Sequence, residues 1–235
     1  MLRIMQHIQC FSLRRQRSAD LLKQLDLGPL QEVERLYLSG NAMHHLNLPT
    51  PFLSLKYLEL AGCHLTDLPE NLSSLAPNLR VLNLCGNNLT DVSSIAIMRR
   101  LERLLLHGNK LKKLSSLSSV LRTIDKLKVL DVRGNPATAG LYSESTAVSG
   151  SQVGEPIDYF ANFDVYAMHE GERQAWQTLD NQFKETMTSA VRERREAYQQ
   201  LIWSLCRSLR WHDGKRLSKD ELILADRHLE TLSTM

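Results

Sequence analysis

Residues 79–89 read Leu-Arg-Val-Leu-Asn-Leu-Cys-Gly-Asn-Asn-Leu, and this stretch contains the pattern that decides the fold. Leucine stands at its first, fourth, sixth and eleventh places, and asparagine stands at its ninth. Five copies of this template follow one another with steps of 22, 24, 22 and 26 residues. They begin at Val33, Leu55, Leu79, Leu101 and Leu127. A period of this length, kept over five copies, indicates a solenoid of stacked units.

The spacing within each copy predicts a short strand followed by a turn. The two central apolar residues alternate with other residues, as in a strand with one buried face. One copy cannot bury its own leucines, but a stack can, so we expect the strands to pair in parallel. The asparagine amide can satisfy backbone groups that the turn leaves unpaired in the interior. Cys63 replaces this asparagine in one repeat. Residues 72–75 and 114–117 favour short helical turns in the segments that lead back to the next strand.

The predicted fold class is α/β, a leucine-rich-repeat solenoid with a parallel sheet on its concave face and helical caps at both ends. Four segments are expected: an N-terminal helical cap over 1–32, five repeats over 33–136, an inserted loop over 137–170, and a long helix with the C-terminal cap over 171–235. Ser18 is expected to begin a helix over 19–25. Apolar residues from Trp176 to Leu205 recur on one helical face, and a helix of that length either breaks or braces the last repeats. Ser218 and Glu221 have the spacing of a capping box for a last helix.

Composition excludes several classes of protein. Apolar residues make up 43% and charged residues 23%, as in globular proteins, and no apolar run is long enough to span a membrane. The formal charge of +3 is too small to indicate a nucleic-acid-binding protein. Four widely spaced cysteines and a start without a signal-peptide core favour reduced thiols in a cytosolic or nuclear protein, and we predict a cytoplasmic location.

We find no catalytic or metal-binding constellation in the sequence. The serine in the string over 150–154 stands one position too early for a nucleophile elbow. Arg173 occupies the position where a zinc-protease helix beginning at His169 needs its second histidine. His44 and His45 are adjacent, so on a strand they would point to opposite faces. We therefore expect no enzyme activity, no cofactor, no metal and no small-molecule substrate.

The positions beside the strand leucines are expected to face the concave side in columns, with one residue per repeat. The first column is Arg35, Tyr57, Val81, Arg103 and Val129; the second is Tyr37, Glu59, Asn83, Leu105 and Asp131; the third is Ser39, Ala61, Cys85, His107 and Arg133. Tyrosine and arginine are frequent in binding hot spots, and the mixture of charges differs from a uniformly basic nucleic-acid surface. Leu105 is apolar where solvent is expected.

We therefore predict a protein partner and no nucleic acid. The predicted partner-binding residues of the concave face are Arg35, Tyr37, Tyr57, Glu59, Asn83, Arg103, Leu105, His107, Asp131 and Arg133. The alternatives are that these are ordinary solvated strand residues, or that the convex side or the C-terminal extension binds. Arg192, Arg194 and Arg195 form a basic cluster there, which either binds a partner or is a solvated helix face paired with glutamates.

The C-terminal part resembles a known family. Residues 131–136, Asp-Val-Arg-Gly-Asn-Pro, followed by Gly-Leu-Tyr at 140–142, resemble the last repeat of the spindle-pole-body scaffolds of the fungal mitotic-exit and septation-initiation networks, to which centriolin is related. The family's arginine-rich helix before a tyrosine is matched by residues 192–202. Its closing segment is matched by Cys206, Leu209, Asp213 and Gly214. His212 stands where the family usually carries an apolar residue.

The resemblance implies a non-catalytic platform at the spindle pole body or another microtubule-organising centre. Its implied partners are a small GTPase, the GTPase-activating complex of that GTPase, or a spindle-pole anchor protein. Two alternatives stay open: a regulatory leucine-rich-repeat subunit of a protein phosphatase, and an RNA-processing repeat protein.

Overall fold

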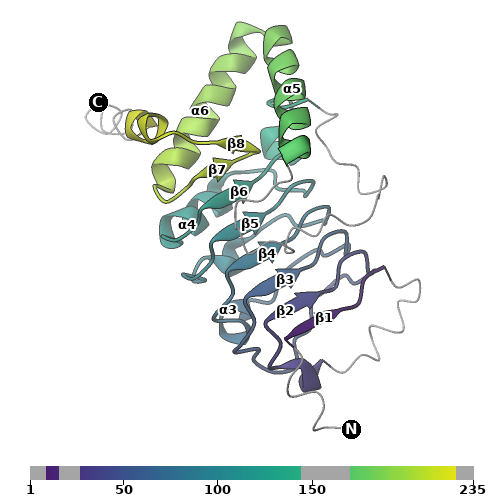
Figure 1. Ribbon diagram of the computed structural model, residues 1–235. Coiled ribbons are helices and arrows are strands. Elements are labelled where there is room, and N and C mark those ends of the chain that lie inside the picture. Colours follow the sequence, from purple (N-terminus) through teal and green to yellow (C-terminus); the bar gives the residue numbers. More distant parts are fainter. Residues whose placement is uncertain (1–8, 16–26, 144–169, 226–235) are drawn as a thin grey trace.

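The computed structural model describes residues 9–15, 27–143 and 170–225, and it arranges their strands in one curved sheet (Figure 1). Eight strands follow one another in chain order across this sheet. They are β1 (Cys10–Ser12), β2 (Arg35–Tyr37), β3 (Tyr57–Glu59), β4 (Val81–Asn83), β5 (Arg103–Leu105), β6 (Val129–Asp131), β7 (Trp211–His212) and β8 (Lys215–Arg216). All neighbours pair in parallel except β7 and β8, which form an antiparallel hairpin.

The strand register confirms the five predicted repeats. The central leucines of β2 to β6 are direct partners of one another: Leu36, Leu58, Leu82, Leu104 and Leu130. All five are fully buried, and they belong to one continuous apolar core. Stacking therefore buries what a single repeat would expose, which confirms the solenoid.

The asparagines at the ninth place hold neighbouring repeats together. The Asn109 amide nitrogen donates to the carbonyl oxygens of Leu84, at 2.8 Å, and Leu106, at 2.9 Å. Its Oδ1 accepts from the backbone N–H of Leu89, at 3.2 Å. Each such side chain therefore binds its own turn and the repeat before it. Cys63 keeps only the donor half of this role, since its thiol donates to the Leu38 carbonyl oxygen at 3.2 Å and burial raises its pKa to about 11.

Short helices and turns return the chain along the convex side. They are η1 (Gly28–Leu30), α3 (Leu72–Leu75), η2 (Ser93–Ile95), α4 (Ser115–Thr123) and η3 (Pro136–Thr138). In α4, Leu117, Val120 and Leu121 are buried, as their helical spacing requires. The helical turns predicted over 72–75 and 114–117 are therefore present, with the second one longer than expected.

The sheet begins one strand earlier than the repeats indicate. β1 lies within the segment predicted as a helical cap, and its Cys10 and Phe11 pair with Arg35 and Leu36 of β2. A helical cap is therefore the wrong description of residues 10–12. The pairing satisfies backbone groups at the edge of β2, which a helix could not do. The predicted helix over 19–25 and its cap Ser18 lie outside the described residues, as does most of the inserted loop predicted over 137–170.

The predicted long helix is broken into α5 (Glu170–Thr186) and α6 (Ser189–Leu205), which stand as a hairpin at the end of the sheet (Figure 1). Thr188 is the N-cap of α6, because its hydroxyl accepts a hydrogen bond from the backbone N–H of Val191. After β8, the capping box is confirmed: Ser218 and Glu221 bond each other's backbone N–H groups at the start of a helix from Lys219. No helix in the described residues has both the length and the apolar character needed to cross a membrane.

Candidate protein-interaction surface

The first two predicted concave columns run continuously across the sheet. Arg35, Tyr57, Val81, Arg103 and Val129 are consecutive register partners, and Trp211 of β7 extends this first column. The second column follows the same register two residues later, from Tyr37 to Asp131. The sequence therefore places the side chains of the concave face correctly.

The burial of these columns differs from the expectation of an open face. Side chains that are less than a tenth exposed are Tyr37, Glu59, Val81, Asn83, Arg103, Leu105, His107, Val129 and Arg133. Arg35, Tyr57 and Asp131 are partly buried. The alternative of ordinary solvated strand residues is therefore wrong for most of the face.

At the N-terminal end, Arg14 explains part of this burial. Its guanidinium carbon lies 4.5 Å from the centre of the Tyr37 ring, and it donates to a Glu59 carboxylate oxygen at 3.1 Å. Ser39 donates to the other Glu59 oxygen at 2.5 Å. Because Arg14 lies outside the repeats, the repeat pattern gives no sign of its position.

At the C-terminal end, Leu105 has a partner within the domain. Leu105 and Val129 pack with Trp211 in a small apolar cluster that Cys85 joins from the side. The apolar character of Leu105, which the sequence presents as a sign of a partner, therefore has a structural cause. The repeat template ends long before Trp211, so the template alone gives no sign that this side chain reaches the concave face.

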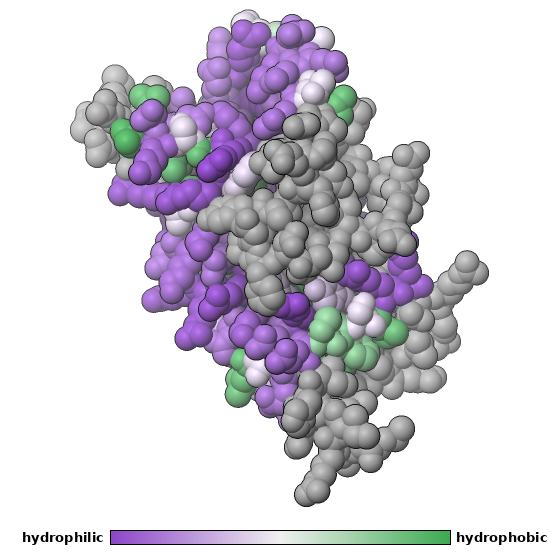
Figure 2. All heavy atoms as spheres, in the orientation of Figure 1, coloured by the Kyte–Doolittle hydropathy of each residue, from purple (hydrophilic) through white to green (hydrophobic). Residues whose placement is uncertain are grey.

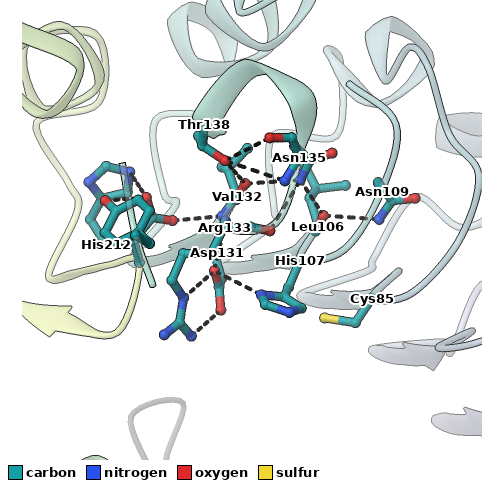
Figure 3. A network of polar contacts seen from close by, with 12 residues as sticks. Cys85, Leu106, His107, Asn109, Asp131, Val132, Arg133, Asn135, Thr138 and His212 are labelled. Atoms are coloured by element: carbon teal, nitrogen blue, oxygen red, sulfur yellow. Dashed lines mark hydrogen bonds and ion pairs between the residues drawn. The ribbon is translucent and has the colours of Figure 1, made fainter. Parts of the chain in front are cut away.

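A charged network occupies the end of the second and third columns (Figure 3). Arg133 donates two hydrogen bonds to Asp131, from Nε at 2.9 Å and from Nη2 at 2.6 Å. The His107 Nδ1 atom lies 4.0 Å from the same carboxylate. Burial opposes the charge on Asp131, but the guanidinium of Arg133 outweighs it and holds the pKa of Asp131 below its usual range. Burial also lowers the pKa of His107.

Cys85, His107 and Asp131 are the residue types of a nucleophilic triad, but their chemistry differs from one. Burial raises the pKa of the Cys85 thiol to about 12, whereas a nucleophilic cysteine needs a lowered value. Figure 3 shows the thiol beside the imidazole ring, with no hydrogen bond between them. Within the described residues, no three histidine, cysteine, aspartate or glutamate side chains gather as a metal site. The network is suited to holding the face in shape.

Helix α5 reaches this same end of the concave face through Trp176. The Arg133 guanidinium carbon lies 4.9 Å from the centre of the Trp176 ring. Gly214, in the turn between β7 and β8, has a φ of +81°, and a Cβ there would lie 3.0 Å from Trp176. Only glycine leaves room for this contact, which explains the Gly214 that the family resemblance singled out.

The three clustered arginines of α6 have different surroundings. Arg195 is buried and donates to both carboxylate oxygens of Asp180, at 2.7 and 2.9 Å. The prediction that it binds a partner is therefore wrong, because α5 packs an acidic residue against it. Arg194 is exposed and donates to the carbonyl oxygen of Ala139 at 2.6 Å. Arg192 is exposed and contacts the Lys184 carbonyl oxygen.

Asp213 joins the cap to the last repeat. Its carboxylate accepts from the hydroxyls of Tyr142 and Tyr198 and from the backbone N–H of Val132, each at 2.7 Å. His212 is accommodated beside it, since its two ring nitrogens lie 3.0 Å from the Tyr198 hydroxyl and from the indole nitrogen of Trp203. The polar partners explain how a histidine stands at a buried position.

Comparison with known proteins agrees with this architecture. A sequence model of the family "Leucine rich repeat" matches residues 53–111. The chain carries a leucine-rich-repeat domain. The chain is 31% identical over 194 residues to the septation initiation network scaffold protein cdc11 of Schizosaccharomyces pombe. The match covers 82% of the chain and 19% of cdc11, and it confirms the resemblance to the septation scaffold family.

Other relatives match a smaller part of the chain. The human leucine-rich repeat-containing protein 56 is 34% identical over 45% of the chain and 19% of its own length. The leucine-rich repeat and WD repeat-containing protein 1 of Danio rerio is 29% identical over 47% of the chain and 15% of its own length. The chain thus spans less than a fifth of each of these relatives.

Two solved structures are also similar. The Drosophila melanogaster SNF/U2A' complex has a chain with 16% identity and a TM-score of 0.41, over 90% of this chain and 80% of that one. The Leptospira interrogans leucine-rich-repeat protein LIC12759 has 24% identity and a TM-score of 0.42, over 57% of this chain and 39% of its own.

Proposed function

We propose that this domain is a non-catalytic protein-interaction scaffold that holds mitotic-exit and septation signalling proteins at the spindle pole body. The similarity to the cdc11 scaffold carries the proposal. The five repeats occupy only residues 33–136, so a match over 194 residues necessarily includes segments outside them. Many proteins share such repeats, whereas the segments around them are particular to fewer.

The contacts of the C-terminal segment support the same proposal. Asp213, Tyr142 and Tyr198 tie α6 and the β7–β8 hairpin to the last repeat through buried hydrogen bonds. A platform of this kind presents a rigid surface, which lowers the entropic cost of binding a partner. The proposed partners are the small GTPase of the pathway, its GTPase-activating complex, or a spindle-pole anchor protein.

We further propose the concave columns as the partner-binding surface, centred on the partly buried Arg35 and Tyr57. The Arg35 guanidinium carbon lies 5.4 Å from the centre of the Tyr57 ring, so the two side chains form one unit. Aromatic and arginine side chains at the centre of an interface usually contribute most of its binding energy.

Co-elution on a sizing column tests the proposal directly. The purified chain is mixed in turn with the GTPase, the activating complex and the anchor, and we expect it to co-elute with at least one of them. Absence of co-elution with all three would contradict the scaffold function. Co-purification of a phosphatase catalytic subunit instead would replace it with the regulatory-subunit alternative.

A pair of variants tests the binding face. Arg35→Ala with Tyr57→Ala is expected to weaken partner binding at least tenfold, because a hot-spot residue contributes on the order of 2 kcal/mol. The matched control is Arg122→Ala with Lys126→Ala, at exposed positions in and just after α4 on the convex side. Equal loss of binding in both pairs would contradict the concave face as the binding surface.

A further inference from the structure

A cavity of about 290 Å³ lies between α5 and the β7–β8 hairpin, at the C-terminal end of the concave face. Its walls are formed by Trp176, Gln177, Asp180, Asn181, Lys184, Lys215 and Arg216. Figure 2 shows that the side chains exposed on the neighbouring α5–α6 hairpin are mostly hydrophilic. Ligand pockets usually measure about 300–1,000 Å³, so this cavity suits one polar side chain of a partner better than a whole element of structure.

The cavity carries an excess of positive charge. Lys184, Lys215 and Arg216 contribute three cations, and Asp180 contributes the one carboxylate of the wall. That carboxylate already accepts two hydrogen bonds from Arg195, and it forms an ion pair with Lys184 at 2.9 Å. Lys215 contacts the carboxylate of Glu221. Arg216 is exposed, and its guanidinium forms no ion pair or hydrogen bond with the described residues. The excess of cations in the wall and the unpaired Arg216 therefore favour an anion.

Two neighbouring buried donors point to the same chemistry: Trp176 lines the cavity, and Arg133, which is not part of its wall, packs against Trp176. Trp176 Nε1 and Arg133 Nη1 have no hydrogen-bond partner, although both side chains are more than nine-tenths buried. Arg133 packs on the Trp176 ring, so the two donors belong to one contact. Nearly all buried polar groups in folded proteins are paired, so the unpaired indole N–H of Trp176 leaves a donor that an acceptor ligand can take up.

We propose that this cavity binds a phosphorylated serine or threonine of a partner protein. The inference rests on the proposed scaffold function and names the chemistry of one of its partners. A phosphate monoester has close to two negative charges and three acceptor oxygens, which match an arginine, two lysines and an indole N–H better than a carboxylate does. The exposed amides of Gln177 and Asn181 can bond the peptide backbone on either side of the phosphate.

The three tryptophans of the chain provide a direct measurement. Their indole N–H signals in a ¹H–¹⁵N correlation spectrum of the full chain are assigned from single Trp→Phe variants. Titration with N-acetyl-phosphoserine amide is expected to shift the Trp176 signal to saturation. The Trp203 signal is expected to stay, because this indole already donates to His212 at 3.0 Å. N-acetyl-serine amide is the unphosphorylated control, and inorganic phosphate should bind more weakly than the phosphoserine compound.

A matched pair of variants locates the binding. Arg216→Gln removes a cation from the cavity and is expected to weaken phosphoserine binding about tenfold, the effect of one charge-assisted hydrogen bond. Arg99→Gln, at an exposed position shortly after η2 and outside the cavity wall, is expected to leave phosphoserine binding unchanged. The absence of a saturable Trp176 shift, an equal response to the unphosphorylated compound, or equal affinities of the two variants would overturn the proposal. If inorganic phosphate binds as tightly as the phosphoserine compound, the proposal that the phosphate comes from a partner protein is wrong.

The sizing-column experiment separates this inference from the scaffold function. If partners co-elute with the chain but phosphoserine does not bind, the cavity proposal is wrong and the scaffold function stands. If phosphoserine binds at Trp176 and none of the three partners co-elutes, the cavity proposal is supported and the scaffold function is wrong.

Discussion

Replacing Asp213 by alanine tests whether the C-terminal cap and the repeats form one cooperative structure. The variant loses three buried hydrogen bonds of 2.7 Å to a carboxylate, from Tyr142, Tyr198 and the Val132 backbone. Bonds to charged groups contribute about 1.5–3 kcal/mol each, but such contributions overlap within one network. Tyr198 also keeps its contact with His212. We therefore expect the free energy of unfolding to fall by about 3–5 kcal/mol, less than the sum of three separate bonds to a charged group.

The backbone at Asp213 contributes to this loss. Its φ of +51° lies in the left-handed region, which asparagine and aspartate tolerate better than alanine. Asp213→Asn keeps the shape and the backbone preference, so it is the matched control, with an expected loss of about 1–2 kcal/mol. Urea unfolding followed by far-ultraviolet circular dichroism measures both values. A loss below about 1 kcal/mol for the alanine variant, or a separate transition for the cap, would refute the reasoning.

Three further perturbations test other contacts. Asn109→Ala removes buried hydrogen bonds to two carbonyl groups and one N–H, so we expect the free energy of unfolding in urea to fall by about 2–4 kcal/mol. The control is Asn88→Ala, at the exposed position beside the buried Asn87 of the preceding repeat, which should change this free energy by less than about 0.5 kcal/mol. Similar losses in both variants would count against the asparagine contacts. Gly214→Ala places a Cβ 3.0 Å from Trp176 at a positive φ, so we expect a loss of about 1–3 kcal/mol and a changed tryptophan emission; an unchanged spectrum would show that Trp176 does not lie there. Burial lowers the pKa of His212 in the folded state below its usual value of 6.5, so the neutral histidine contributes fully to stability above pH 6.5. This contribution is lost as the pH falls from 6.5 toward the lowered pKa of the folded state. We expect the urea midpoint to decrease from about pH 7 to pH 5, and to decrease less in His212→Leu; an increase would contradict this.

The sequence predicts the parts of the fold that its own repeat encodes. Leu36, Leu58 and Leu82 occur at one place in the template, and because identical units stack in register, their spacing is enough to place both the core and the concave columns. The capping box at Ser218 is predictable for a different reason: the two residues that form it lie within one helical turn, so their spacing in the sequence is enough.

Contacts from outside the repeats could not be predicted in this way. β1 pairs because β2 offers an unpaired edge, and its own three residues carry no repeat pattern. Arg14 at one end and Trp176 at the other contact side chains of the concave face, and neither position follows from periodicity. The surroundings of Arg195 depend on the break at Thr188, which turns α5 back and brings its acidic side chain alongside.

The parallel pairing of β6 with β7 has a practical consequence for locating binding regions by truncation. A fragment that stops after residue 136 loses the strand beside Val129 and Leu130, and it exposes a hydrogen-bonding edge together with the apolar surface that Trp211 covers. Exposed strand edges attract other chains indiscriminately. Pull-downs with such fragments would therefore detect non-specific binding to the newly exposed edge. Point substitutions in the intact chain are the better way to locate the residues that bind a partner.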